Sequence, residues 1–569
     1  MKKRTTIFLT VFISIIAMNA MLQANDMKTI NRNYEYVQLK GENFPQYTAE
    51  QVPIDQLYLY AYRAATGQWE PIPFQVDEMD FREIGVDSTL SYFPIGIEQN
   101  QLFDNRDELV FMVRDLGDQA DTKKWIDDIS ASENPRYQII VTDPYNGANK
   151  RGWAYLFRSS NNLPKSTKVY VDYDANLDRA SSSNYEIGHD AQGNLDLVKI
   201  KTSAPGYYLD ILDRNKFRYS GKILFAPYDW SDTSLYKDVN PANAYPPIEI
   251  KKGPIRVIRL LHTTLNLEGL NTFKVPFTSR FYSHIFRVSK KIDLIDYDAL
   301  AKTEHVRFSY DYSDNARGMK FFSGDSGRVN VNQNIVMDGQ GKTDGVVDSL
   351  SRKKSFWTMV SGAPGSVLSL NDIRYFGGEN YSWRLYYWDS SDNDAKDQAH
   401  TGLSTGDDVS IGDNGVMFTG DKLTSKIEAV SDIFLLKANF PADSAWTLFD
   451  NFNTPVALSI NYQIRTDVAD GSDGPSVKQF RLLPAYPNPF NALTTISFDL
   501  PVRERVVVDI FNINGNYVTT LVDRHFDAGS HQIQWDGRNA SGVSAGSGVY
   551  FIKLQTETHF ATVKTILLK

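Results

Sequence analysis

The last part of the chain, from Leu482 to Leu568, restricts the fold more than any other stretch, because it contains only short strand-like runs separated by turns. In the first run Ile496, Phe498 and Leu500 alternate with polar residues, which is typical of a strand with one buried face. Asn514-Gly515 is a tight-turn signal between two later runs. The pattern predicts a small β-sandwich. Its six expected strands are Thr494–Leu500, Arg505–Asn512, Tyr517–Val522, Gly529–Trp535, Gly548–Gln555 and Phe560–Leu568.

Several residues of this tail form an ordered set. They are Tyr486, Pro487, Asn488, Pro489 and Phe490, the turn from Asn512 to Gly515, Ala528-Gly529, Trp535-Asp536-Gly537, Gly548, Val549 and Tyr550, and the closing Lys564, Leu567, Leu568 and Lys569. The set resembles the type A C-terminal sorting domain of the type IX secretion system, and it is similar to the related Ig-like domain of flagellar hook-capping proteins. Ala492 departs from the pattern, since many relatives carry Pro there. The resemblance implies an Ig-like fold for residues 482–569, and export across an outer membrane with secretion machinery as the partner. It also implies that the tail is often removed after export and the protein attached to the cell surface.

The N-terminus also indicates export. A basic start, Met1 to Arg4, precedes an apolar run from Ile7 to Met18 that is too short to span a bilayer comfortably. We interpret residues 1–24 as a secretory signal peptide. We expect no transmembrane segment in the mature chain, and a secreted protein that can also attach to the outer surface of the outer membrane.

Composition excludes several kinds of chemistry. The chain has no cysteine, which rules out disulfides, thiolate metal sites and cysteine nucleophiles. Its net charge is −9, which argues against nucleic-acid binding. No motif for a nucleotide, a zinc protease or a serine triad is present, so no cofactor is implied apart from a candidate Ca²⁺ site.

The body between signal and tail reads as β-rich throughout. Gln56–Arg63 and Trp69–Val76 are expected to form a hairpin whose second strand lies at a sheet edge, because its prolines cannot donate ladder hydrogen bonds. Leu435–Thr466 is expected to supply the final strands. We predict an all-β protein with a large sandwich-like body of one or two units. The expected domains are 25–245 and 246–466, followed by a linker at 467–481 and the tail at 482–569.

One strand pattern, Thr278–Ile295, places Arg280, Tyr282 and His284 on a single face. Tyr or His can abstract a proton next to a uronate carboxylate, and Arg can neutralise that carboxylate. The trio is therefore a candidate polysaccharide lyase site. The alternative is the solvent-facing half of an ordinary strand.

An aromatic segment and the acidic loop that follows it are the other candidate sites. Tyr381, Trp383, Tyr387 and Trp388 are candidate sugar-stacking residues, although Trp383 and Tyr387 share a face with Leu385 and equally suit a core. Carboxylate oxygens suit Ca²⁺. The candidate Ca²⁺ ligands are Asp389, Asp392 and Asp394.

Three functions remain open at this point. The first is a surface-displayed or secreted non-catalytic protein, binding or structural, with a glycan as the expected ligand. The second is a secreted carbohydrate-active enzyme such as a polysaccharide lyase. The third is a cofactor-free surface-layer or adhesion component. A deep groove around Arg280, Tyr282 and His284 would favour the enzyme.

Overall fold

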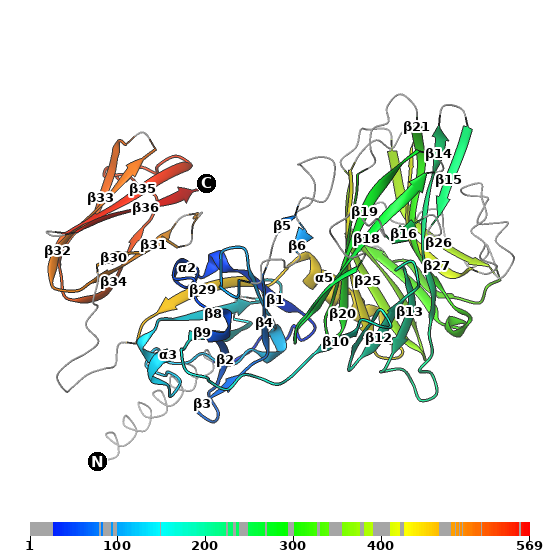
Figure 1. The fold of residues 1–569 in the computed structure, drawn as a ribbon, viewed down its shortest axis with the longest axis horizontal. Helices are drawn as coiled ribbons and strands as arrows, with labels where there is room; N and C mark the ends of the chain where they lie inside the picture. Colours follow the sequence, from blue (N-terminus) through cyan, green and yellow to red (C-terminus); the bar gives the residue numbers. More distant parts are fainter. Residues whose placement is uncertain are drawn as a thin grey trace, which may run out of the picture.

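The structure is a computed structural model, and the prediction of an all-β protein is confirmed, because antiparallel sheets dominate the chain (Figure 1). It describes residues 27–78, 81–82, 93–94, 100–147, 149–223, 226–231, 235–237, 248–267, 270–293, 301–326, 330–340, 355–375, 381–390, 410–420, 426–465, 480–483, 485–486, 488, 490–491, 493–513, 515–556 and 559–568. The predicted signal peptide and most of the predicted linker lie outside these residues. Among the described residues, no helix combines the length and the apolar character needed to cross a membrane.

The first unit packs a five-stranded sheet, in the order β29-β8-β9-β2-β3, against a three-stranded sheet, in the order β1-β7-β4. Leu57, Leu59 and Ala61 of β2 enter the core between the sheets, and the tyrosines that alternate with them pack on the other face. The predicted hairpin forms between β2 and β3, and β3 lies at the sheet edge as expected. The predicted second strand, Trp69–Val76, is divided, however, because its second half is β4 of the three-stranded sheet. The strands are β1 (Tyr36–Lys40), β2 (Leu57–Arg63), β3 (Gln68–Pro71), β4 (Phe74–Asp77), β7 (Glu108–Met112), β8 (Arg136–Thr142), β9 (Arg151–Arg158) and β29 (Ala457–Gln463), with short helices α2 (Pro45–Ala49) and α3 (Ile129–Glu133) and a small ribbon of β5 (Phe81–Arg82) and β6 (Phe93–Pro94).

The second unit is built on a ten-stranded sheet. One face of this sheet packs against two smaller sheets, which share a single core with it. The large sheet contains β16 (Leu235–Lys237), β17 (Ile248–Lys252), β18 (Val257–Leu267), β19 (Leu270–Phe281), β20 (Ile285–Asp293), β22 (Lys320–Asp325), β23 (Asn330–Val336), β24 (Ser355–Gly362), β25 (Gly365–Tyr375) and β28 (Lys426–Leu436). The smaller sheets contain β10 (Val171–Asp174), β11 (Arg179–Ser182), β12 (Tyr185–His189) and β13 (Leu195–Ile200), and β14 (Leu212–Ile223), β15 (Ala226–Ser231), β21 (Ala301–Tyr312), β26 (Tyr381–Ser390) and β27 (Ser410–Gly420).

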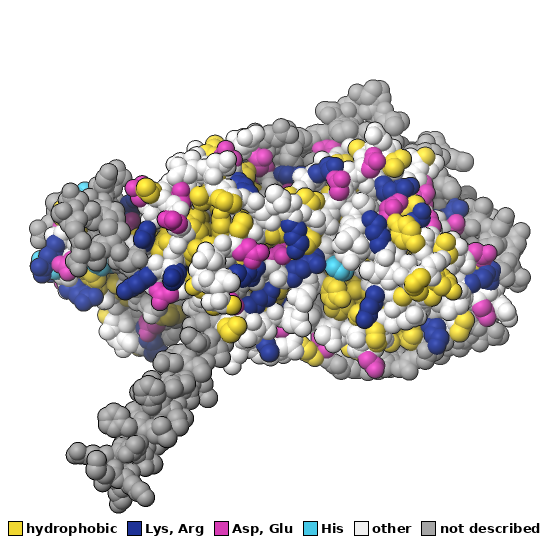
Figure 2. Space-filling model, turned by 90° about the horizontal axis from the view of Figure 1, so that it is seen from below, with side chains coloured by type: hydrophobic (Ala, Val, Ile, Leu, Met, Phe, Trp, Pro, Cys, Tyr) yellow, Lys and Arg dark blue, Asp and Glu magenta, His cyan; other side chains and the backbone are white. Residues whose placement is uncertain are grey.

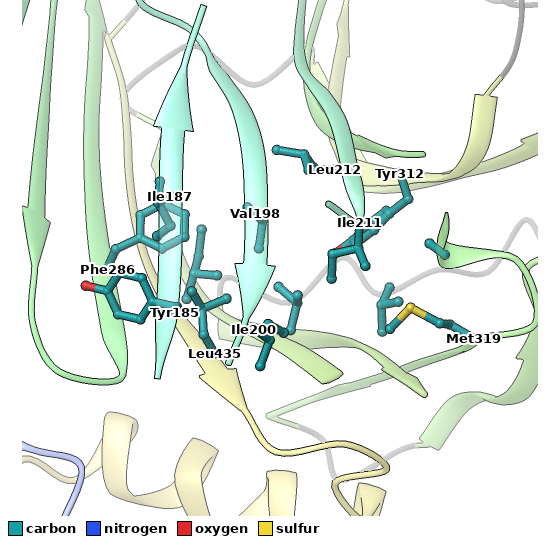
Figure 3. Packing of buried hydrophobic residues seen from close by; sticks show 14 of the residues in the cluster. Tyr185, Ile187, Val198, Ile200, Ile211, Leu212, Phe286, Tyr312, Met319 and Leu435 are labelled. Atoms are coloured by element: carbon teal, nitrogen blue, oxygen red, sulfur yellow. The ribbon is translucent and has the colours of Figure 1, made fainter. Parts of the chain in front are cut away.

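The core of the second unit shows how alternation builds these layers. Tyr185 and Ile187 of β12 and Val198 and Ile200 of β13 point toward Phe286 and other residues of the large sheet (Figure 3). All five side chains are buried. Such a period-two arrangement places one face of each strand in the core, as in other sandwiches.

Two expectations about the body need correction. Strands on both sides of the predicted boundary at 245/246 share sheets, since β14 pairs with β21 and β16 pairs with β18. The loop-like composition near that boundary therefore does not separate domains, and residues 238–247 themselves lie outside the described residues. The predicted run of final strands from Leu435 to Thr466 instead contains helix α5 (Ala442–Asn453), which packs Ala445, Leu448 and Phe449 on the other face of the large sheet.

The C-terminal domain follows the sequence prediction closely. Ile496, Phe498 and Leu500 are fully buried, as their alternation predicted. The domain packs a three-stranded sheet, in the order β30-β31-β34, against a four-stranded sheet, in the order β33-β32-β35-β36. Its strands are β30 (Arg481–Leu482), β31 (Thr494–Leu500), β32 (Glu504–Asn512), β33 (Tyr517–Phe526), β34 (Gly529–Trp535), β35 (Gly548–Gln555) and β36 (Phe560–Leu567).

Candidate functional site

The predicted long strand through Arg280, Tyr282 and His284 is a hairpin in the structure. β19 ends at Phe281 and β20 begins at Ile285, with Tyr282, Ser283 and His284 forming the turn. The Tyr282 backbone N–H donates to the Ile285 carbonyl at 2.7 Å, which closes the turn. The turn contains no Gly, Pro or Asn, which are the residues that most clearly indicate a turn. The sequence analysis therefore predicted one continuous strand here.

Tyr282 lies at the junction of the two units and is fully buried. Its ring stacks on Tyr36 of β1 with centroids 4.1 Å apart and planes 8° from parallel. Its hydroxyl accepts a hydrogen bond from Arg256 at 3.3 Å. The hydroxyl is thus part of an internal network and does not face an open groove.

Arg256 is the centre of this junction network, which joins Gln38, Gln75, Asp77 and Glu108 of the first unit to Tyr282. Arg256 Nε donates to Asp77 Oδ2 at 2.8 Å, and its terminal nitrogens contact Gln38 and Glu108. Burial by itself lowers the pKa of Arg256, but Asp77, Tyr282 and Glu108 outweigh it, so the pKa lies well above its usual value. Paired and hydrogen-bonded in this way, the buried charges join the two units.

The other two members of the trio differ in environment. Burial, followed by the nearby Arg256 charge, lowers the pKa of Arg280. His284 Nδ1 lies 2.8 Å from Ser283 Oγ, and its ring meets Tyr34 edge-on at 5.0 Å. Burial and the Arg114 charge lower the pKa of His284 to about 4, so its imidazole is neutral at pH 7. Arg280 and Tyr282 belong to the surroundings of Arg256, whereas His284 packs against a different set of side chains.

The aromatic candidates on β26 divide between the two faces of the strand. Tyr387 packs on Phe321 of the core with ring centroids 4.5 Å apart, and Leu385 on the same face is buried. Trp388 lies opposite Asp413 of β27 on the other face and is half-buried. The side chains of Tyr381 and Trp383 lie outside the described part of the structure.

Asp389, a predicted Ca²⁺ ligand, binds backbone amides. Its carboxylate accepts hydrogen bonds from the N–H groups of Asp338 and Gly339, each at 2.9 Å, and from Gly412 at 3.2 Å. These bonds join β26 to the loop that follows β23 and to the start of the neighbouring strand β27. Asp392 and Asp394 lie outside the described residues, within which no cluster of three or more His, Asp or Glu side chains suits a metal ion.

The sequence analysis missed a polar face on the sheet β15-β14-β21-β27-β26, which we define by Lys216, Arg307, Ser309, Asp311 and Tyr386. Lys216 Nζ and Asp311 Oδ2 form an ion pair at 2.8 Å with both side chains fully buried. The Arg307 guanidinium lies 4.5 Å from the centre of the Tyr386 ring and donates to its hydroxyl at 3.0 Å. The alternation of polar residues at 307, 309 and 311 could have indicated this polar face, but the same pattern is equally typical of a strand face exposed to solvent.

The sorting-motif residues meet at one end of the C-terminal domain. The Phe490 N–H donates to the Ile566 carbonyl, and the Leu568 N–H donates to the Phe490 carbonyl, each at 2.9 Å. Asn488 Oδ1 accepts from the Ile566 N–H at 2.8 Å. The entry segment is therefore paired with the last strand, β36. Pro487, Pro489 and Lys569 lie outside the described residues.

Aromatic packing completes this end of the domain. Phe490 is buried against Trp535 with centroids 5.3 Å apart, and Trp535 meets Tyr550 at 5.0 Å. The Tyr550 hydroxyl donates to the Gly546 carbonyl at 2.7 Å. Val549 of the predicted motif pairs with Ile566, and Gly548 pairs with Leu567. The motif residues are thus brought together by the fold, although they come from opposite ends of the domain.

Comparison with known families agrees with this architecture. Residues 492–559 match the family described as the FlgD Ig-like domain. The C-terminal domain is Ig-like. The match covers this domain alone, and no curated protein matches the chain.

Solved structures resemble the chain only distantly. The alignment with an alpha-mannosidase from Enterococcus faecalis covers 90% of this chain and 55% of the mannosidase, at 8% identity and a TM-score of 0.39. The alignment with a polysaccharide lyase covers 68% of this chain and 47% of the lyase, at 8% identity and a TM-score of 0.19. PorZ, a surface component of the type IX secretion system of Porphyromonas gingivalis, aligns with 72% and 48% at 10% identity and a TM-score of 0.13. The chain spans about half the length of these proteins, and likeness at this level carries no functional argument.

Proposed function

We propose that this protein is exported through a type IX-like secretion system by its C-terminal Ig-like domain and displays or releases a glycan-binding body outside the cell. The observation that carries the export proposal is the Ig-like tail, with the motif residues at its two ends paired through Phe490, Ile566 and Leu568. A signal peptide at residues 1–24 would supply the first step, across the inner membrane.

The export proposal is tested in a bacterium with a type IX system. The full chain is expressed beside a chain truncated after residue 480, and each is followed by cell fractionation and by added protease on intact cells. We expect the full chain at the surface or in the medium, and the truncated chain in the periplasm. A host lacking the outer-membrane translocon is the control, and it should retain both chains. Equal export of the truncated chain would contradict the proposal.

A glycan is the proposed ligand of the body, for two reasons of chemistry. Acidic and basic side chains are interspersed on the face seen in Figure 2, so that face offers no extended basic surface for a polyanion. The body also exposes the rings of Tyr145, Tyr207 and Tyr208, and an aromatic ring with a hydroxyl group is the kind of surface that a sugar ring contacts. The proposed role is binding, since Tyr282 is buried within the junction network.

Binding is tested with the purified full chain on a panel of soluble polysaccharides, with and without a chelator. We expect saturable binding with no formation of unsaturated sugar products, which absorb in the ultraviolet. Turnover to such products would replace the binding function with a lyase, and lack of any binding would remove the glycan from the proposal while leaving export untouched.

A further inference from the structure

A cavity of about 330 Å³ lies between the first unit and the C-terminal domain. The body contributes Gln46, Asn461 and Gln463, and the tail contributes Thr495, Ser497 and Gln532. Its volume is at the lower end of the range for small-molecule sites.

The position of the cavity follows from two strands. β29 is an edge strand, since among the described residues it pairs only with β8. β31 turns its apolar residues into the domain core, so Thr495 and Ser497 face outward, and Gln532 of β34 lies opposite Ser497 on the same face. The outer face of the tail thus covers the open edge of the body, and the two surfaces do not close completely.

The lining is polar but carries no charge. Amide groups and hydroxyl groups alternate around the walls, while Pro45, Ile460 and Leu483 supply apolar patches. Tyr137, Tyr462 and Tyr486 add aromatic rings, and Tyr462 meets Tyr137 edge-on at 5.5 Å. A neutral ligand that combines several hydroxyls with apolar C–H faces matches these walls, whereas an anion or a cation finds no counter-charge.

Some polar groups of the lining are occupied and others remain available. Gln463 Oε1 accepts from Arg136 at 2.8 Å, and Asn461 Nδ2 donates to Gln138 at 3.1 Å, so each keeps one end of its amide free to bind. The side chains of Thr495, Ser497 and Gln532 make no hydrogen bond to another described residue. On the body wall, these hydrogen bonds hold the amides of Asn461 and Gln463 in place. On the tail wall, the hydroxyl and amide groups of Thr495, Ser497 and Gln532 are available to bind a ligand.

We infer that this cavity is a binding site for a short neutral glycan, made jointly by the body and the C-terminal domain. The inference rests on the proposed glycan-binding function and names its ligand class and its place. Because the tail forms one wall, removing the tail removes the site. The Arg481–Glu50 ion pair, at 3.3 Å across the rim, joins the two parts but is exposed, so it contributes little to holding them together.

A matched pair of variants tests the site. Gln532→Phe places a ring at the cavity wall, whereas Gln534→Phe makes the same change two residues along β34, at a position that is equally exposed but outside the lining. Asn461→Phe fills the cavity from the body side. Binding of cellobiose, maltose, lactose and N,N′-diacetylchitobiose to the full chain is measured by calorimetry, with digalacturonate as the charged comparison.

We expect one or more neutral disaccharides to bind, digalacturonate to bind less, and both Gln532→Phe and Asn461→Phe to weaken binding at least about tenfold. Gln534→Phe should bind like the parent chain. If the parent binds a disaccharide and Gln532→Phe binds it equally well, the site is overturned while glycan binding by the body stands. If no disaccharide binds the parent, the site is overturned whatever the polysaccharide panel shows. Secretion of Gln532→Phe, measured in parallel, reports on the export proposal separately.

Discussion

Arg256 shows how a single residue joins the two units of the body. Its guanidinium is fully buried and contacts Asp77 and Glu108, both from strands of the first unit. Replacing it by Met removes the cation that the two buried carboxylates share, although Lys251 still lies 3.9 Å from Asp77. The change should cost about 3–5 kcal/mol of unfolding free energy. Denaturant unfolding of Arg256→Met measures this loss. Arg505→Met is the control, because Arg505 pairs with Asp523 at the surface and its removal should cost less than about 1 kcal/mol. A loss below that of the control would mean that the junction network does not stabilise the body.

Asp196 of β13 gives a prediction about pH. Burial, with the charges of Asp190 and Asp210, raises its pKa from 3.8 to about 6. At pH 7 the carboxylate is ionised in both the folded and the unfolded chain. In the folded chain its burial and the neighbouring negative charges destabilise the ionised form, and this is a free-energy penalty on folding. The penalty falls as pH drops below the folded pKa and is gone once pH is below the unfolded pKa. Asp196→Asn should therefore raise the thermal midpoint at pH 7 and have little effect near pH 4. A gain of equal size at both pH values would contradict this account.

At the scale of single elements, the pairing of the tail's entry segment with β36 carries the next prediction. Phe490 is 1% exposed and packs on Trp535, whereas Phe560 of β36 is 76% exposed. Phe490→Ala should cost the C-terminal domain about 3–5 kcal/mol because it leaves a cavity in the core. Phe560→Ala should change stability little, and it is the matched control. The measurement is thermal unfolding followed by the fluorescence of the tail, with export of each variant scored alongside.

The same elements show what a sequence can and cannot predict. The alternation of Ile496, Phe498 and Leu500 predicted a strand and its buried face, because one-sided burial imposes period two. The reversal at Tyr282–His284 was not predicted, since Ser283 is its only residue with a turn preference and apolar strand-like residues flank it on both sides. Helix α5 was missed because its apolar face is defined by packing on the large sheet.

The candidate sites divide in a similar way. Asp389 has the residue type of a calcium ligand, but its oxygens accept hydrogen bonds from backbone amides of the loop after β23 and of strand β27. No local sequence pattern indicates these bonds. Lys216 and Asp311 lie on strands whose polar and apolar residues alternate as they do on an exposed sheet face, yet both side chains are fully buried. The alternation alone does not show whether such a face is covered. Residue type and spacing thus indicate which chemistry a side chain is capable of, but not which side chains the fold uses for internal contacts.

At the scale of the whole molecule, the chain closes its first unit with its last body strand. β29 pairs with β8, buries Ile460 in the first core and follows directly after α5. Arg32 near the start of the described chain donates to the Thr454 carbonyl at 2.8 Å, which joins the two ends of the body. Figure 1 shows this return of the chain from the second unit to the first. The first unit therefore cannot complete its sheet until the whole body has been made.

This order of assembly gives the final prediction. A chain that ends at residue 465 retains β29 and should resist limited proteolysis, although it lacks the C-terminal domain. A chain that ends at residue 456 leaves the edge of β8 unpaired and exposes the core around Ile139 and Val141, so it should aggregate or be digested. If the shorter chain were as resistant as the longer one, β29 would not be needed to complete the body. Because β29 precedes the tail in the sequence, a chain that carries the tail also carries the strand that closes its first unit.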